Sequence, residues 1–296
     1  MFSNWCWHEP FQLIVDAGEG LQLALGQKIW APEVVALTHG HSDHVLGLPG
    51  LVASRKFAKG AQEKPLTVVF PDGNSGVLAV RELLARMWSA SDFPVTWVPV
   101  RAGGEFRLGK TRVLQAFPTS HGGSEPTLGY VVREERRRLK PEYSGLPEQE
   151  IRELVRNGGR DVLMEPYRHI RFAHTGDAMP VDPALVARAD VLVHDATFLD
   201  ADDRKWDIHA TTAEAIGVGE AAGVGCLVLH HLSVRYDRAA ALPKAISWVL
   251  REHTRHCPGA VAAFVEEHGP ELPAVAVREA RNKLATGYKG GRRPGR

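Results

Sequence analysis

A cluster of potential metal ligands occupies one short stretch near the start of the chain. Four ligand-type side chains, His39, His41, Asp43 and His44, stand within six positions of each other. Imidazole nitrogens and carboxylate oxygens are the ligands that zinc and similar divalent ions prefer. One histidine in a loop is most often a surface or packed residue, but four such residues at this spacing indicate a metal site. The arrangement suits two ions, with His39 and His41 pointing to one and Asp43 and His44 to the other.

The residues on either side of this cluster predict the elements that position it. A β-branched run at 33–37 predicts a strand, and 48–58 predicts a helix. The cluster therefore lies on a loop between a strand and a helix.

Four later apolar runs also end in polar clusters. Because ligands collect at strand ends in α/β folds, each cluster offers further metal ligands. Alone, each would more often be an ordinary loop residue, but together with the first loop they supply enough ligands for two metals. The candidates are His121, Asp177, His194 with Asp195, and either His230 or His231.

Strand and helix patterns alternate along the rest of the chain, which predicts a layered α/β or α+β domain. The predicted strands are 11–16, 66–70, 95–100, 105–108, 110–117, 127–133, 170–174, 191–194, 226–230 and 261–264. The predicted helices are 21–27, 76–89, 147–156, 183–189, 211–222 and 238–253.

Composition restricts the class of protein. Hydrophobic residues make up 44% of the 296 positions and charged residues 24%, which predicts a folded chain with a sizeable core. A net charge of +1 does not by itself indicate a polyanionic partner.

The three cysteines and the lack of long apolar segments bear on the compartment. Cys6, Cys226 and Cys257 have no disulfide-framework spacing, which favours a reducing compartment, and Cys226 is expected to be buried. We see no signal peptide and no stretch long enough to cross a bilayer. We therefore expect a cytoplasmic protein with no membrane partner.

The first loop resembles a known signature. The motif His39-x-His41-x-Asp43-His44, followed by Gly-Leu-Pro-Gly, is similar to that of the metallo-β-lactamase fold. The later clusters resemble ribonuclease Z, the tRNA 3′-processing endonuclease, in the same order over roughly residues 10–240. These clusters are Ser120-His121, Leu128-Gly129-Tyr130, Thr175-Gly176-Asp177, His194-Asp195-Ala196-Thr197-Phe198, His209-Ala210-Thr211 and His231-Leu232-Ser233. The resemblance implies an αββα sandwich, with two mixed sheets packed face to face and helices outside.

The resemblance also implies a ligand set. One metal would take His39, His41 and His121, and the other would take Asp43, His44 and His231, with Asp177 bridging them. Zinc fits this histidine-rich set best, although Mn²⁺ or Fe²⁺ would use the same ligands. Two such metals activate a bridging hydroxide and neutralise charge on a phosphodiester.

Three residues are expected to move or direct protons. Asp43 would receive the proton of the nucleophile, and His209 would protonate the leaving 3′-oxygen as general acid. Asp195 would hold the other nitrogen of His209, although the family usually has the longer Glu at this position. His194 and His230 are expected to support the site without binding metal.

Three functions remain open at this stage. The preferred one is a dinuclear metal hydrolase that cuts RNA, most specifically the 3′ end of a tRNA precursor. The alternatives are a small-molecule phosphodiesterase or other ester or lactone hydrolase of the same fold, and a non-catalytic RNA- or partner-binding module. The family resemblance further implies a homodimer.

The expected organisation is one metallo-β-lactamase-like domain at 1–270, a compact basic arm inserted at about 134–169, and a C-terminal segment at 271–296. That segment ends in a Gly/Arg-rich tail, which we expect to be partly disordered. The basic run at 136–140 in the arm either binds RNA phosphates or is a solvated face. The family's N-terminal RNA-binding loop has no match in the given sequence, so either the start is trimmed or the loop is absent.

Overall fold

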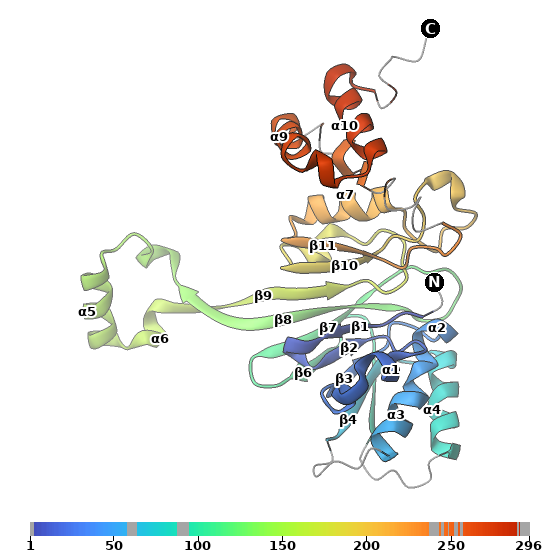
Figure 1. Cartoon of the computed structure of the whole chain (residues 1–296). Helices are drawn as coiled ribbons and strands as arrows, with labels where there is room; N and C mark the ends of the chain where they lie inside the picture. Colours follow the sequence, from blue (N-terminus) through green and yellow to red (C-terminus); the bar gives the residue numbers. More distant parts are fainter. Residues whose placement is uncertain are drawn as a thin grey trace.

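The molecule is built from two mixed β-sheets packed face to face with helices on their outer faces (Figure 1). The computed structural model describes residues 3–57, 64–87, 95–236 and 257–288, and the positions 243, 246, 247, 249–251, 254 and 290. The layers confirm the predicted αββα sandwich.

The first sheet has the strand order β1-β2-β3-β4-β5. β1 is antiparallel to β2, and the other neighbours are parallel. β2 and β3 are buried along their whole length, as expected for apolar strands covered on both faces. The strands are β1 (Cys6–His8), β2 (Leu13–Val15), β3 (Val34–Ala36), β4 (Leu66–Pro71) and β5 (Val95–Val100).

The second sheet has the order β11-β10-β9-β8-β7-β6. β9, β10 and β11 run parallel, whereas β6, β7, β8 and β9 form an antiparallel meander. The strands are β6 (Glu105–Leu108), β7 (Arg112–Pro118), β8 (Leu128–Leu139), β9 (Met164–His174), β10 (Val191–Asp195) and β11 (Cys226–His230).

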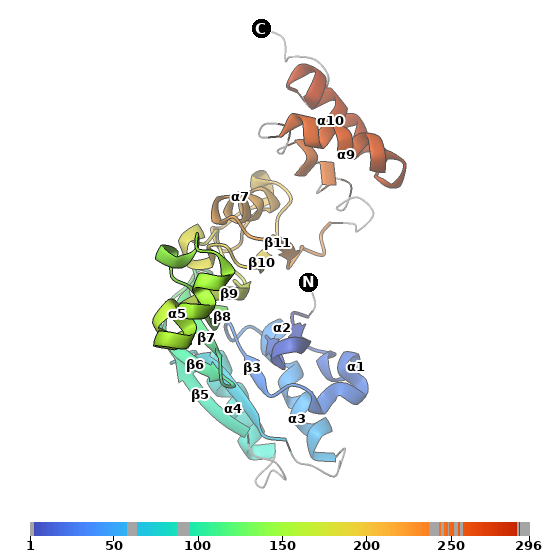
Figure 2. The same ribbon diagram turned by 90° about the vertical axis from the view of Figure 1, so that its left-hand side faces the viewer.

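Three apolar clusters hold the layers together. One lies between the sheets, one lies between the first sheet and its helices, and one packs the second sheet against α7 (Thr212–Ala222) and the short 3-10 helix Pro183–Val186. Trp5, Trp7 and Trp30 pack on the second of these clusters, so they belong to the core. The helices of the first sheet are α1 (Leu21–Leu25), α2 (Ser42–Val45), α3 (Gly47–Phe57) and α4 (Ser75–Met87), seen together in Figure 2.

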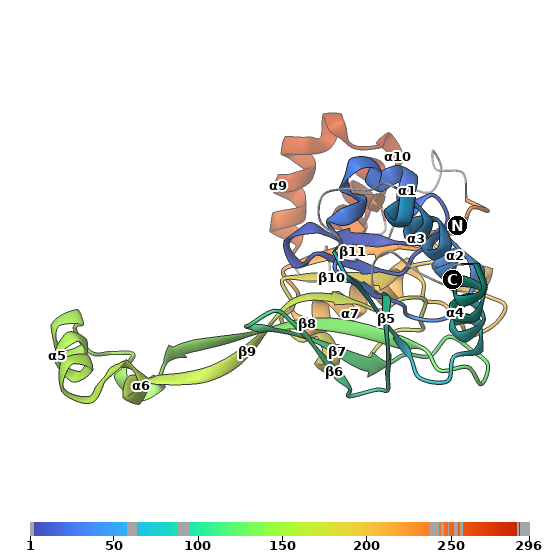
Figure 3. The ribbon, with the colours of Figure 1, turned by 90° about the horizontal axis from the view of Figure 1, so that it is seen from below.

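The inserted arm is a long ribbon and not a compact unit. β8 and β9 stay paired as far as Leu139 and Met164, and they carry the 3-10 helix Pro141–Tyr143, α5 (Glu148–Gly158) and α6 (Arg160–Leu163) away from the body (Figure 3).

Nor does the arm have a basic net charge, because residues 134–169 hold eight Lys and Arg and eight Asp and Glu. Several arginines are paired, including Arg138 with Glu165 at 2.7 Å and Arg152 with Glu148 at 2.6 Å.

The C-terminal helices correct one predicted element. Residues 261–264 were expected to be a strand, but they lie inside α9 (Pro258–His268), which packs on α10 (Ala274–Thr286). Val261 and Val265 are four residues apart and share one buried helix face. The boundary that we placed at residue 270 falls between these two helices, and our division into domains stays a prediction.

Other predictions differ in detail. Cys226 is exposed because β11 is an edge strand of its sheet. Helix 183–189 is only a short 3-10 helix, and β1 was not predicted. Most of helix 238–253 and most of the Gly/Arg-rich tail lie outside the described residues. No helix in the described ranges has the length and apolar character needed to cross a membrane.

Candidate metal centre

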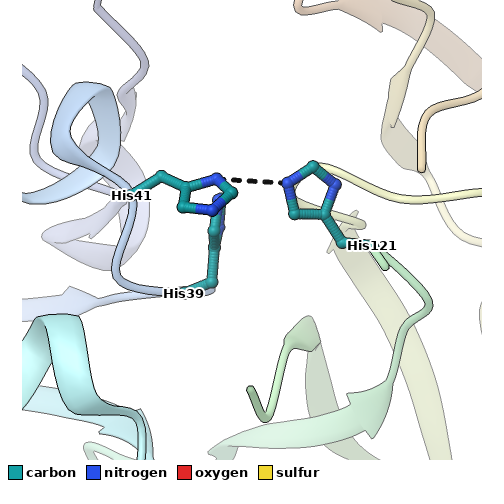
Figure 4. A group of neighbouring side chains, drawn as sticks. All are labelled: His39, His41 and His121. Carbon is teal, nitrogen blue, oxygen red and sulfur yellow. Dashed lines mark hydrogen bonds between the residues drawn. The ribbon is translucent and has the colours of Figure 1, made fainter. Parts of the chain in front are cut away.

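Three histidines from the two sheets converge at one point (Figure 4). His39 and His41 follow β3, and His121 follows β7 of the other sheet. His41 Nδ1 lies 3.2 Å from His121 Nε2, and one ligand atom from each of the three rings falls within 4.8 Å of the others.

The backbone and a hydroxyl orient two of these rings. His39 Nδ1 donates to Thr38 Oγ1 at 3.0 Å, and His121 Nδ1 donates to the carbonyl of Ile208 at 2.8 Å. The Nε2 atom of each ring is therefore unprotonated and can donate its lone pair to a metal. Metal-binding histidines are usually oriented by a hydrogen bond of this kind on the other ring nitrogen.

A second group lies beside the first and joins Asp43, His44 and His231. The Nε2 atoms of both histidines are 3.6 Å from Asp43 Oδ2. On the far side of each ring, His44 Nδ1 donates to Asp16 Oδ2 at 2.8 Å and His231 Nδ1 donates to Thr197 Oγ1 at 2.6 Å.

Asp177 lies between the two groups. Its Oδ2 atom is 3.2 Å from His44 Nε2 and 3.3 Å from His231 Nε2, and 3.9 Å from the Nε2 atoms of both His39 and His121. One carboxylate oxygen therefore faces both groups, as a bridging ligand must.

The donor atoms fit divalent ions. Tetrahedral coordination with bonds of about 2.0–2.2 Å places neighbouring ligand atoms about 3.3–3.6 Å apart. The measured separations in the second group, including those to Asp177, are 3.2–3.6 Å. Moreover, His39 Nε2 and Asp177 Oδ1 are buried without a hydrogen-bond partner among the described residues, which a bound ion would explain.

The electrostatics of this pocket also favour a cation. Burial alone lowers the pKa of His44, but the carboxylates of Asp16 and Asp177 outweigh it and raise that pKa well above its usual value. Burial raises the pKa of Asp177, yet His44 and its other histidine neighbours hold it well below the usual range. For Asp43, the hydrogen bond to His231 and the charge of His44 outweigh burial and lower the pKa to about 2.

Two of the four non-glycine residues with positive φ in the described part of the chain lie at the site. Asp16 has φ of 60° and His231 has φ of 64°, a left-handed conformation that is costly for residues other than glycine. Gly176, next to Asp177, has φ of 63°, and a Cβ there would lie 2.6 Å from Thr38. The fold therefore holds Asp16 and His231 in a left-handed conformation at the place where the ligands have to be oriented.

His209 and Asp195 form a tight pair beside the second group. His209 Nδ1 donates to Asp195 Oδ2 at 2.6 Å, so the aspartate reaches its partner despite being shorter than the family's usual glutamate. Asp195 is fully buried and also accepts hydrogen bonds from Ala178 N and from the backbone and hydroxyl of Thr197. Burial lowers the pKa of His209, but the hydrogen bond and charge of Asp195 outweigh it, so the net pKa is raised.

The loop that carries His209 is anchored at the start of α7. Thr211 and Glu214 form a capping box there, and Arg204 Nη1 donates both to Glu214 Oε2 at 2.8 Å and to the carbonyl of His209 at 3.2 Å. As a result, the His209 ring stacks on His231, with centroids 4.9 Å apart.

All the predicted site residues meet at one open cleft of about 430 Å³ or directly behind it. His194 is buried away from the cleft, where its Nδ1 donates to the carbonyl of Asp195 at 2.7 Å. His230 does not line the cleft either. The residues that line it are Glu19, His41, Ser42, Asp43, His121, Asp177, Ile208, His209 and His231.

Sequence reasoning missed several supporting residues. Asp16, Thr38 and Thr197 each orient a histidine, and of these three only Thr197 stands in one of the motifs quoted above. Asn4 was also missed, although its Nδ2 lies 2.7 Å from Asp43 Oδ2.

Comparison with known proteins agrees with this geometry. Residues 12–164 match the family model described as a beta-lactamase superfamily domain. The crystal structure of the short form of human tRNase Z superposes with a TM-score of 0.54 at 23% identity, covering 76% of this chain and 82% of that chain. The metallo-beta-lactamase fold protein YhfI from Bacillus subtilis gives 0.53 at 18% identity, with 79% of each chain covered. The molecule is thus a metallo-β-lactamase-fold protein.

Curated sequences narrow the class to a family. The chain is 32% identical to ribonuclease Z of Haloarcula marismortui, covering 77% of this chain and 79% of the relative. It is 34% identical to ribonuclease Z of Gemmatimonas aurantiaca, covering 76% and 78% respectively. The chain belongs to the ribonuclease Z family. A second model, described as a DNA alkylation repair enzyme, matches only residues 234–284, which include α9 and most of α10.

Proposed function

We propose that this ribonuclease Z family member is a metal-dependent endoribonuclease that cleaves tRNA precursors at the 3′ side. One observation carries the proposal: a single Asp177 oxygen lies within 4 Å of histidine nitrogens from both ligand groups, beside the His209–Asp195 pair. The relatives that cover most of the chain are named ribonuclease Z.

The ligand assignment follows the two groups. His39, His41 and His121 would hold one divalent ion, Asp43, His44 and His231 would hold the other, and Asp177 would be shared. Bound ions in such a pair lower the pKa of a water and offset charge on the phosphate oxygens. Zinc suits the nitrogen-rich set, and Mn²⁺ or Fe²⁺ use the same ligands.

The remaining chemistry belongs to side chains of the chain itself. Asp43 is ionised at neutral pH and accepts the proton of the attacking water. His209, with its raised pKa, keeps a proton on Nε2 while Nδ1–H points to Asp195, and it delivers that proton to the leaving 3′-oxygen. Asp195 fixes the ring and favours its charged form.

The same proposal includes a cytoplasmic homodimer. The three cysteines have no disulfide-framework spacing, which is in keeping with a reducing compartment. Leu23 on α1 and Leu46 next to α2 are exposed by 81% and 44%, which supports a contact surface on this side of the first sheet. Sedimentation equilibrium tests the dimer, and a monomer at micromolar concentration would refute it.

The function is tested with two substrates and one purified protein. We expect cleavage of a tRNA precursor that leaves a 3′-hydroxyl on the tRNA, and loss of this activity in Asp177→Ala. Turnover of bis(p-nitrophenyl) phosphate without any RNA cleavage would refute the nuclease and favour a small-molecule phosphodiesterase. Fewer than two bound metal ions after reconstitution, with neither activity, would favour a binding module.

A further inference from the structure

Asn4 brings a carboxamide into the second ligand group from a part of the chain that carries no ligand motif. It stands two residues before β1 and is fully buried. Its Nδ2 atom lies 2.7 Å from Asp43 Oδ2 and 2.9 Å from His44 Nε2.

The geometry shows which end of the carboxamide faces the ligand group. Nδ2 is the atom that lies within hydrogen-bond distance of Asp43 Oδ2. A carboxylate that serves as a metal ligand only accepts hydrogen bonds, so the NH₂ end donates to it, and the oxygen end would be repelled at this position.

The side chain is not needed to hold this segment in place. The backbone does so, because Asn4 N donates to the carbonyl of Asp43 at 2.8 Å and Gly18 N donates to the carbonyl of Asn4 at 2.9 Å. The other carboxamide atom, Oδ1, is buried without a hydrogen-bond partner among the described residues. An orphaned acceptor of this kind destabilises the folded state, so the side chain does not serve stability at this position.

The two atoms that Asn4 contacts, His44 Nε2 and Asp43 Oδ2, are 3.6 Å apart and form one edge of the second ligand group. Within the described residues, no hydrogen bond of Asn4 reaches His39, His41 or His121. The effect of this side chain is therefore confined to one of the two metal positions.

Resting on the ligand assignment proposed above, we propose that Asn4 is a positioning residue for the second metal. Its amide holds the Asp43 carboxylate in the orientation that the ion requires, and it sets the affinity of that position without being a ligand. Hydrogen-bond partners of metal ligands typically change metal affinity by about 10–100-fold when they are removed.

The test is a zinc titration of the metal-free full-length protein against a chelating indicator. We expect Asn4→Ala to weaken one of the two zinc equivalents about 10–100-fold and to leave the other unchanged. Asn4→Asp should weaken the same equivalent, because it places a second acceptor against Asp43. The matched control is Ser3→Ala. Ser3 belongs to the same segment as Asn4, but its Oγ donates to the carbonyl of Glu19, which is not a proposed ligand.

A double variant identifies the affected position. His231→Ala removes a ligand of the second metal, so adding Asn4→Ala to it should cause no further loss of zinc. Tighter binding in Asn4→Asp would make Asn4 a direct oxygen ligand and overturn the positioning role. Equal weakening of both equivalents, together with a lower melting temperature of the metal-free protein, would make its role purely structural. If the wild type itself fails to bind two zinc ions, the ligand assignment fails before Asn4 is tested.

Discussion

His209 is the residue whose removal best separates chemistry from metal binding. It lies beside His121 and His231 but is oriented by Asp195. We expect His209→Ala to keep both metals and to slow precursor cleavage by about 10²–10⁴-fold, the usual contribution of a general acid. Turnover of bis(p-nitrophenyl) phosphate, whose leaving group needs no proton, should change far less. Equal loss on both substrates would contradict the assignment.

The pKa of His209 sets the alkaline limit of activity. Because this pKa is raised, the acid stays protonated above the usual histidine range, and activity falls as the pH rises through the raised value. Asp195→Asn removes the carboxylate that raises it, so the fall should begin at lower pH. A kcat/KM profile of both proteins measures the shift, and metal content is the control. An unchanged alkaline limb would rule out His209 as the titrating acid.

For individual residues, the sequence indicated the metal ligands but not the residues that orient them. His39 to His44 are adjacent in the chain, so their spacing alone predicts a site. Asp16 and Asn4 act through contacts across 28 and 39 positions, and nothing in their local sequence reveals those contacts. The orphaned Nε2 of His39 likewise appears only once burial is known.

Among the elements, the ribbon formed by β8 and β9 is the one most open to deletion. It carries few contacts to the body beyond the sheet, and its charges balance. We expect a short turn in place of 140–163 to leave two bound metals and to keep small-ester turnover within about twofold. The slope of log Kd for precursor RNA against log salt should change by less than about one unit, because the deleted residues hold four Lys and Arg against five Asp and Glu. A slope change of several units would show that basic residues of this segment bind RNA phosphates.

The prediction of helices and strands succeeded where the apolar pattern extended over many residues, and it failed where the pattern covered only a few. The helical spacing of Val77, Val80, Leu84 and Met87 predicted α4, and the first three of these residues are buried on one face, whereas Met87 is exposed. The run 261–264 is too short for its period to separate a strand from a helix, and it belongs to α9. The extension of β8 to Leu139 was missed because charged residues on an exposed ribbon show no burial pattern.

For the molecule as a whole, bound metals would link the two sheets. His39 follows a strand of the first sheet, whereas His121 and Asp177 follow strands of the second. Ions at one hundred times their Kd would stabilise the fold by about 2.7 kcal/mol each. We therefore expect chelation to lower the melting temperature by about 5–10 °C, and added zinc to restore it. Calorimetry measures this, and Asp177→Ala should show little response to either treatment.

The strand and helix patterns alone predicted a layered α/β or α+β domain, and the αββα sandwich followed from the resemblance of the motifs at the strand ends to a known family. Substrate choice and assembly could not be predicted, because they depend on surfaces that are brought together only by folding. The exposed Leu23 illustrates this, since its position on α1 gave no sign of which face would remain open.

The separation of the ligands along the chain has a consequence for how the protein is made. The first four leave the ribosome early, but His231 emerges almost two hundred residues after His39. A nascent chain therefore holds only part of each coordination shell until most of both sheets has been synthesised. Tight metal uptake must then be a late event of biogenesis, performed by the folded molecule and not by the growing polypeptide. Cells starved of metal would accumulate an assembled but inactive form, which needs only the ions to become competent.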